Sequence, residues 1–223
     1  MRNTNARKMK QKKQGVNPLV RKPARIRAPV MSFDGTILNG SNYTASLTTV
    51  ANVAAAVMLV DASATTAVGP PIIRSQAAEL AGITTFYQEF KYLKSAVQWI
   101  PQVAPGVADG GSRVTMCYVD NAETMAFLNA AGVAALVAFA KTSRTAVTFN
   151  AWEHYKFNVP LSNRRKTFDV NNSTVATNVD IVDRSIQGMV IVIVESVSAA
   201  ATIGQLRNTY SIRLAHLNTT TTT

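Results

Sequence analysis

Apolar and polar residues alternate with a period of two in several segments after residue 30, which is the pattern of half-buried β-strands. This pattern predicts six strands, over residues 42–50, 90–101, 114–119, 147–151, 155–161 and 206–214, and a continuous apolar run makes a seventh plausible over 53–60. The run 53–60 is rich in alanine and would also suit a helix. Residues 189–194 are six consecutive apolar residues, five of them β-branched. They predict an eighth, central strand that is covered on both faces.

Two segments follow a helical period instead. Residues 123–141 repeat their apolar positions at helical spacing, with Asp120 or Asn121 as the N-cap. The apolar part of this segment, 125–140, is too short to span a bilayer roughly 30 Å thick, which requires about 20 residues. We therefore expect a buried helix there. A second, short helix is expected over 74–81, with Ser75 as its N-cap and Gly82 just past its end.

The order of these elements predicts the fold class. Successive strands are mostly joined without a long helical crossover, which excludes a parallel α/β sheet. We predict an all-β fold: an eight-stranded antiparallel jelly-roll sandwich with two short inserted helices and a disordered basic N-terminal arm. The arm covers residues 1–30, the jelly-roll domain 31–218 and a frayed threonine tail 219–223, and the polar stretch 162–184 is expected to be a loop.

Charge is distributed very unevenly along the 223 residues. The whole chain has 23 Lys and Arg against 12 Asp and Glu, a net charge of +11. Residues 1–30 contain no acid and ten basic residues: Arg2, Arg7, Lys8, Lys10, Lys12, Lys13, Arg21, Lys22, Arg25 and Arg27. The remaining 193 residues sum to +1. A proline-containing segment this cationic is expected to be disordered alone and to bind polyanions with little sequence preference.

The residues that most enzymes and metal sites need are scarce. Cys117 is the only cysteine, which excludes a disulfide framework and CxxC zinc sites, and we expect an inert thiol. The two histidines are His154 and His216, and His216 shares the phase of Tyr210 and Leu214, so it is expected to be packed. The sequence contains no GxSxG, HExxH, Walker-type or GxGxxG motif. We therefore expect a protein that is not an enzyme.

One stretch resembles a known family. The aromatic-rich run FYQEFKYLKSAVQWIP, residues 86–101, is similar to the start of the fourth strand in the shell domains of sobemoviruses and tombusviruses. Gly110 and Gly111, a strand, Asp120 and an inserted helix follow in the order that this family has. The basic arm and the last strand also fit, whereas the first two strands and residues 162–184 match nothing in the pattern.

The resemblance implies a capsid protein. Such a protein would assemble with itself into an icosahedral shell, package its genome, expected to be single-stranded RNA, through the basic arm, and form part of the virion after assembly in the host cytoplasm. No membrane partner is expected. The alternative is a cellular nucleic-acid-binding protein, of ribosomal or chromatin type, with a basic tail. Such proteins usually spread positive charge over the folded body as well, whereas this body is nearly neutral.

The resemblance also implies one candidate metal site, and no other cofactor is expected. Asp120 and Glu123 stand where members of this family often hold Ca²⁺ between subunits, and Ca²⁺ needs six to eight oxygens. The alternative is that both are helix N-terminal acids that stabilise the helix dipole. Asp180 and Asp183 are a second, weaker pair, with a solvated loop as the alternative. The basic triplet 164–166 could extend an inner basic surface, pair across an interface or be a solvated loop.

Overall fold

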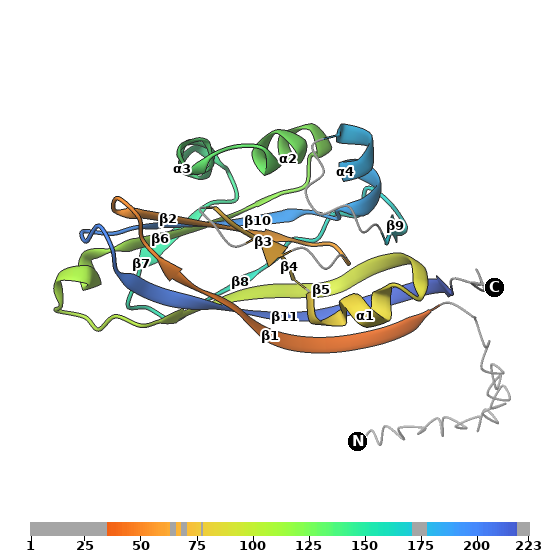
Figure 1. Cartoon of the computed structure of the whole chain (residues 1–223), viewed down its shortest axis with the longest axis horizontal. Coiled ribbons are helices and arrows are strands. Elements are labelled where there is room, and N and C mark those ends of the chain that lie inside the picture. The colour runs from red at the N-terminus through yellow and green to blue at the C-terminus, as the bar shows by residue number, and fades with distance from the viewer. Residues whose placement is uncertain (1–34, 63–65, 68–70, 77, 171–177, 218–223) are drawn as a thin grey trace, which may run out of the picture. The chain divides into compact units, whose positions relative to one another are not determined.

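The structure, a computed structural model, describes residues 35–62, 66–67, 71–76, 78–170 and 178–217. The predicted arm and the threonine tail lie outside these residues. The described part consists mainly of β-strands in two sheets, with helices over one of them (Figure 1). The all-β prediction is therefore confirmed for the body of the chain.

Eight strands, four in each sheet, form the main part of the two sheets. The first sheet has the order β1 (Thr36–Thr48), β11 (Thr202–Leu217), β5 (Tyr87–Pro101) and β8 (Tyr155–Asn158). The second contains, in order, β2 (Val53–Leu59), β10 (Met189–Glu195), β6 (Arg113–Val119) and β7 (Val147–Asn150). All neighbours within each set of four are antiparallel. The predicted jelly-roll sandwich is confirmed, and the alanine-rich run after residue 52 is a strand.

Short elements at one side of the sandwich differ from the prediction. The second sheet continues from β2 to a parallel β4 (Ile72–Ser75) and then β3 (Thr66–Ala67), while β9 (Phe168–Asp169) pairs with β5. The helix expected over 74–81 is wrong at its start, because Ser75 ends β4 and its Oγ donates to the backbone oxygen of Asp61 at 3.2 Å. A 3-10 helix η1 (Ala78–Leu80) and α1 (Ala81–Thr84) follow, so Gly82 lies inside α1.

Aromatic side chains fill the space between the two sheets. Phe90, Tyr92, Trp99 and Phe168 are the four largest side chains that are fully buried. The indole Nε1 of Trp99 donates to a backbone oxygen at 2.8 Å, which satisfies its only polar group. Gly204 lies against this indole, where a Cβ would come within 2.2 Å of the ring. The size of Trp99 therefore fixes a glycine in β11.

A β-bulge in β5 decides which of its side chains reach the core. The pairing with β11 skips Leu93, so the alternation reverses at that residue. Tyr92 points into the core before the bulge, whereas Val97 and Trp99 do so after it. Strict alternation along 90–101 would place Leu93 on the same face as Val97 and Trp99, but the bulge leaves its side chain 44% exposed.

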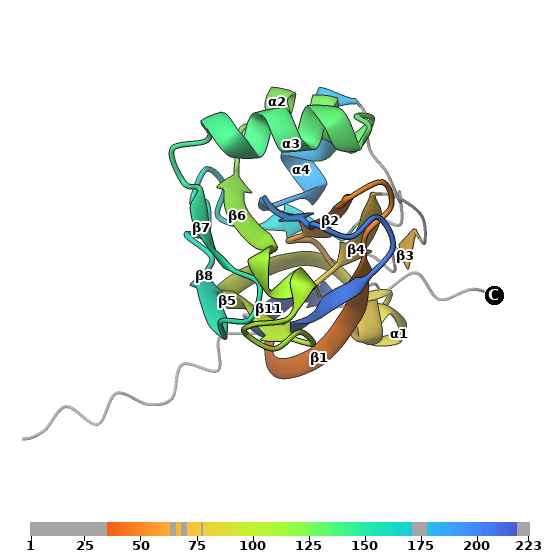
Figure 2. The ribbon, with the colours of Figure 1, turned by 90° about the vertical axis from the view of Figure 1, so that its left-hand side faces the viewer.

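A layer of helices covers the outer face of the second sheet (Figures 1 and 2). The expected helix over 123–141 is two helices, α2 (Ala122–Asn129) and α3 (Val133–Thr142), separated at Gly132, which is the N-cap of α3. A third helix, α4 (Val179–Ser185), overlaps the end of the stretch 162–184 that we expected to be a loop. Because apolar residues of β10 pack on both the core and the helices, the prediction of a doubly covered strand is confirmed.

No helix within the described ranges is long and apolar enough to cross a membrane.

Candidate functional site

The first sheet exposes its outer face, and this face is rich in basic residues. In both views α2, α3 and α4 lie above the second sheet, on the far side from β1, β11 and β5 (Figures 1 and 2). Strand alternation therefore places one set of side chains of the first sheet in solvent. We call this surface the basic face, and its basic residues are Lys91, Lys94, Lys156, Arg207 and Arg213.

Polar side chains form rows across the basic face, because residues in register on neighbouring strands lie about 5 Å apart. The pairing gives three such rows: Tyr43, Arg207, Gln98 and Lys156; Ser41, Thr209, Ala96 and Asn158; and Asn39, Ser211 and Lys94. These rows contain amides, hydroxyls and cations but no carboxylate. They are therefore rich in hydrogen-bond donors.

The near-neutral charge of the body is not uniform over its surface. The basic face holds five basic residues and two acids, Glu89 and Asp169, which are opposite each other in register at one end. The rest of the described chain holds eight basic and nine acidic residues. The positive charge of the folded body is thus concentrated on the one sheet face that carries no helix layer.

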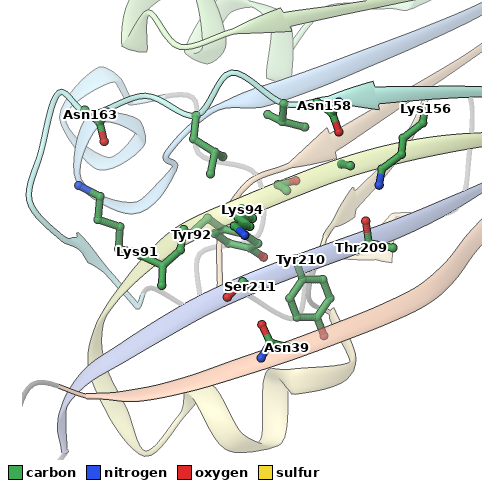
Figure 3. A pocket seen from close by; sticks show the side chains of 15 residues that line it. Asn39, Lys91, Tyr92, Lys94, Lys156, Asn158, Asn163, Thr209, Tyr210 and Ser211 are labelled. Carbon is green, nitrogen blue, oxygen red and sulfur yellow. The ribbon is translucent and has the colours of Figure 1, made fainter.

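Three of these lysines surround a hollow of about 640 Å³ (Figure 3). Lys91 and Lys94 come from β5 and Lys156 comes from β8, and Asn39 and Asn158 add amide groups to the lining. The Nζ of Lys91 donates to the backbone oxygen of Arg165 at 3.1 Å. Lys94 and Lys156 are exposed and form no hydrogen bond or ion pair with any described residue. Their charges are available to a ligand.

An exposed aromatic ring lies in the same rows. Tyr43 is 59% exposed, and the guanidinium carbon of Arg207 lies 5.5 Å from the centre of its ring. Arg207 Nε also donates to Ser41 Oγ at 2.8 Å, which fixes the guanidinium in place. A basic group beside an exposed ring is the combination that binds unstacked bases. Sequence reasoning missed it because Tyr43 and Arg207 become neighbours only through strand pairing.

A second candidate surface lies at one end of the sandwich, which Figure 2 views directly. Four connections meet there: residues 49–52, 102–112 with the 3-10 helix η2 (Ala108–Gly111), 151–154 and 196–201. We call this surface the loop end. Backbone hydrogen bonds of 2.8–2.9 Å join them, from Thr49 to Ala201, from Ser196 to Asn52 and from Ala151 to Ser112. These bonds join the connections in two pairs, and the hydrogen bond from Ser112 Oγ to Ser196 Oγ at 3.0 Å links the two pairs to each other.

The loop end exposes apolar side chains that this network holds in position. Val50, Val107, Trp152 and Val197 are between 40% and 63% exposed, one from each connection. Asn52 adopts a φ of +70°, and its Nδ2 donates to the backbone oxygens of Ser196 and Val197. A preorganised apolar surface loses little conformational entropy when it becomes buried against a partner. Trp152 is thus at the surface, in contrast to the buried Trp99.

Asp120 and Glu123 lie at the start of α2, and both are exposed. The N-cap between them is Asn121, whose Oδ1 accepts from the Thr124 backbone N–H at 2.9 Å. Within the described ranges no three His, Cys, Asp or Glu side chains come together in a group that could hold a metal. A Ca²⁺ ion at this position would therefore need further oxygens from backbone carbonyls or from a neighbouring chain.

One member of the second acidic pair, Asp183, contacts two members of the basic triplet, Arg164 and Arg165. Arg164 Nε lies 3.3 Å and Arg165 Nε 3.0 Å from the two carboxylate oxygens of Asp183 in α4. The Arg164 guanidinium also donates to the backbone oxygens of Asp120 and Ile186. Two guanidinium groups occupy Asp183, which disfavours a cation there. Arg164 fastens the polar loop to α4 rather than extending a basic surface.

Cys117 and His216 lie in contrasting environments, one buried and one exposed. Cys117 is buried under the helix layer, and burial raises the pKa of its thiol to about 12, so the reactive thiolate is scarce near neutral pH. His216 is not packed as expected. It adopts a φ of +55°, which breaks the alternation, and its side chain is 67% exposed, with Nε2 3.7 Å from Glu89 Oε2.

Comparisons with known proteins point to one family. The family model described as "Viral coat protein (S domain)" matches residues 15–219. No curated protein matches the chain in sequence.

Solved structures are similar in fold. The coat of Cocksfoot mottle virus superimposes with a TM-score of 0.62 at 14% identity, over 83% of this chain and 97% of that one. Tobacco necrosis virus gives 0.63 at 14% identity, over 83% of this chain and 84% of that one. A nodavirus of Penaeus vannamei gives 0.60 at 15% identity, over 97% of this chain and 63% of that one.

Proposed function

The chain belongs to the viral coat protein (S domain) family, and we propose that it assembles with copies of itself into a closed icosahedral shell around a single-stranded RNA genome held by its basic arm. Family membership makes it a structural virion component rather than an enzyme. It also removes the support for a cellular nucleic-acid-binding protein. We further propose that assembly takes place in the host cytoplasm.

The contrast in charge between arm and body carries the packaging proposal. Ten cations and no anion in residues 1–30 precede a body that sums to +1. Each lysine or arginine that meets a phosphate releases a counterion, so binding by the arm is strong at low salt and largely independent of sequence. Neutral bodies can pack side by side without mutual repulsion. In this proposal the arm has the positive charge that binds the genome, and the body, through which subunits touch, has almost no net charge.

The arm also sets how much genome can be neutralised. A shell of about 60 subunits would present roughly 600 arm charges, and one of about 180 subunits roughly 1,800, against one negative charge per nucleotide. The coding sequence for this chain alone needs about 669 nucleotides by the same counting. The larger shell suits a self-sufficient genome, and the smaller one suits only a satellite.

The loop end supports the self-assembly proposal. Four apolar side chains of the loop end are exposed to solvent in the single chain: Val50, Val107, Trp152 and Val197. Four connections that meet at the end of a sandwich form a surface that copies related by a symmetry axis can share. We propose that these side chains become buried between subunits. Trp152 is the central contact because aromatic residues dominate interface energies.

A Ca²⁺ ion between subunits at Asp120 and Glu123 is a separate proposal. The support is two exposed carboxylates beside the N-cap of α2, which need only a neighbour's oxygens to form a site. In the variant D120N/E123Q, shells should no longer swell when a chelator is added. D180N is the matched control and should swell as the native protein does. Unchanged swelling of D120N/E123Q would remove the calcium site.

The packaging proposal is tested by changing only the charge of the arm. Replacing its ten basic residues by glutamine should abolish packaging, so that shells contain almost no nuclease-protected RNA. The matched control exchanges lysine for arginine and arginine for lysine at the same ten positions, which keeps the charge, and should package normally. Absorbance at 260 and 280 nm of purified particles measures the RNA content. Normal packaging by the glutamine variant would refute the role of the arm.

A further inference from the structure

We propose that the basic face is a second nucleic-acid site, at which the hollow between β5 and β8 binds phosphates of a single strand and Tyr43 stacks on one of its bases. This inference rests on the proposed function, since it names where the folded body would touch the packaged strand. It does not depend on the arm. The site is built from described residues of β1, β5, β8 and β11.

Electrostatics favour an anion in the hollow. Lys91, Lys94 and Lys156 all line it, and neither Lys94 nor Lys156 has a counter-charge among the described residues. The two acids of the basic face lie at its end, at Glu89 and Asp169, rather than in the hollow. Amines of like charge around one hollow repel each other, and a bound anion relieves that repulsion.

The chemistry of the lining favours phosphate groups. Asn39 and Asn158 add amide N–H donors to the lining of the hollow, and Thr209 and Ser211 add hydroxyl donors (Figure 3). Phosphate oxygens in nucleic acids accept hydrogen bonds from these same groups. None of the lining side chains is acidic. An anionic group of a ligand would therefore meet several hydrogen-bond donors and no carboxylate.

The length of the basic face favours a nucleic-acid strand over a small anion as its ligand. Hydrogen-bond donors continue from the hollow across the sheet. One row crosses all four strands, from Lys156 through Gln98 and Arg207 to Tyr43. A small anion would use only one part of this row, whereas a polymer of phosphates can use all of it. Tyr43 offers an exposed ring at the far end of the row, and stacking on a ring requires an unpaired base. The geometry thus points to single-stranded nucleic acid.

The test uses the full chain with two matched double variants. K94Q/K156Q removes two charges from the hollow, and R144Q/R184Q removes two charges from exposed positions on the helix side of the molecule. Binding of a fluorescent oligouridylate of about ten nucleotides is measured by anisotropy over roughly 0.05 to 0.5 M salt. The same series is repeated with inorganic tripolyphosphate as competitor.

The expected result is a change in the salt dependence for one variant only. Each phosphate contact in a single strand contributes about 0.7 to the slope of log affinity against log salt, so K94Q/K156Q should lower the slope by about 1.4. Over the decade from about 0.05 to 0.5 M salt, the affinity of K94Q/K156Q relative to that of the native chain should therefore be roughly 25-fold lower at the low-salt end than at the high-salt end. R144Q/R184Q should keep a slope close to that of the native chain.

Three results would overturn the inference. Equal slopes for the two double variants would mean that the hollow makes no special contact with the strand. If K94Q/K156Q binds oligouridylate as the native chain does but tripolyphosphate no longer competes with that binding, the hollow is a site for small anions. Unchanged binding by K94Q/K156Q together with impaired nucleic-acid-free assembly would make the basic face a contact between copies. If instead the native chain binds no oligouridylate at all, it is the proposed packaging function that fails.

Discussion

Ile191 and Ser211 both point away from the space between the sheets, yet Ile191 is fully buried whereas Ser211 is only half-buried. The difference comes from what lies outside each sheet. Val57, Cys117 and Ile191 form a second apolar layer under α2, α3 and α4. The corresponding positions of the first sheet hold lysine, arginine, serine and asparagine. One outer face is thus a second core, and the other is free to bind.

The comparison shows how a jelly roll can separate stability from binding. The covered face uses apolar burial, which is not directional and needs only shape. The open face carries groups that stabilise the fold little, because exposed charges and hydroxyls contribute small energies. Substitutions on the basic face can therefore be selected without a large loss of stability. Changes in the covered face are expected to be costly.

The largest expected effect follows from placing the same charge on each face. I191K puts a cation beneath the helices and should lower the free energy of unfolding by about 4 kcal/mol or more. S211K adds a lysine to a face that is already basic and should change it by less than about 0.5 kcal/mol. Urea unfolding under conditions that keep the chain monomeric measures both. Similar losses for the two variants would contradict the division between the faces.

A smaller effect is expected from two exposed aromatic residues on opposite sides. Y43A removes the ring beside Arg207 and should weaken binding of a single-stranded oligonucleotide by about 1–3 kcal/mol, the usual contribution of one stacked base. Y43F keeps the ring and should bind almost as the native chain does. Phe127 is 66% exposed on α2, and F127A should leave the affinity unchanged. Equal losses for Y43A and F127A would show that Tyr43 has no particular role.

The smallest effect concerns the titration of Cys117 on the covered face. Burial raises the pKa of its thiol from 9.0 to about 12, so the folded state keeps a proton that the unfolded state loses. The resulting stabilisation is full below pH 9.0, the unfolded value, and is lost as the pH rises toward 12. The free energy of unfolding of C117A should therefore fall less steeply above pH 9 than that of the native chain. Parallel curves would place the thiol in a more solvated environment.

Much of the fold could be predicted from local patterns, and the exceptions have local causes. The apolar run at 189–194 predicted a doubly covered strand because no surface strand could tolerate it. The exposure of Leu93 and His216 could not be predicted, since a bulge and a positive φ reverse an alternation that appears regular in sequence. The helix α4 was missed because seven residues give too short a pattern.

The candidate surfaces were harder to predict than the strands. The arm was recognised from charge alone, and its residues lie outside the described part of the chain. The basic face needs three strand pairings at once, because Arg207 meets Tyr43 only through the β1–β11 register and Lys156 only through β5. No single segment of the sequence has that information. The sequence singled out the triplet 164–166 as a candidate basic surface, but Arg164 and Arg165 form ion pairs with Asp183 of α4.

The most direct test is a cryo-EM reconstruction of particles formed by the full chain with packaged RNA. The jelly roll can be placed in such a map without assumptions about its orientation. We expect the basic face to line the interior, with nucleic-acid density next to Lys94 and Lys156, and the loop ends to meet around symmetry axes. A shell in which the helix layer faces the RNA and the basic face points outward would contradict the account.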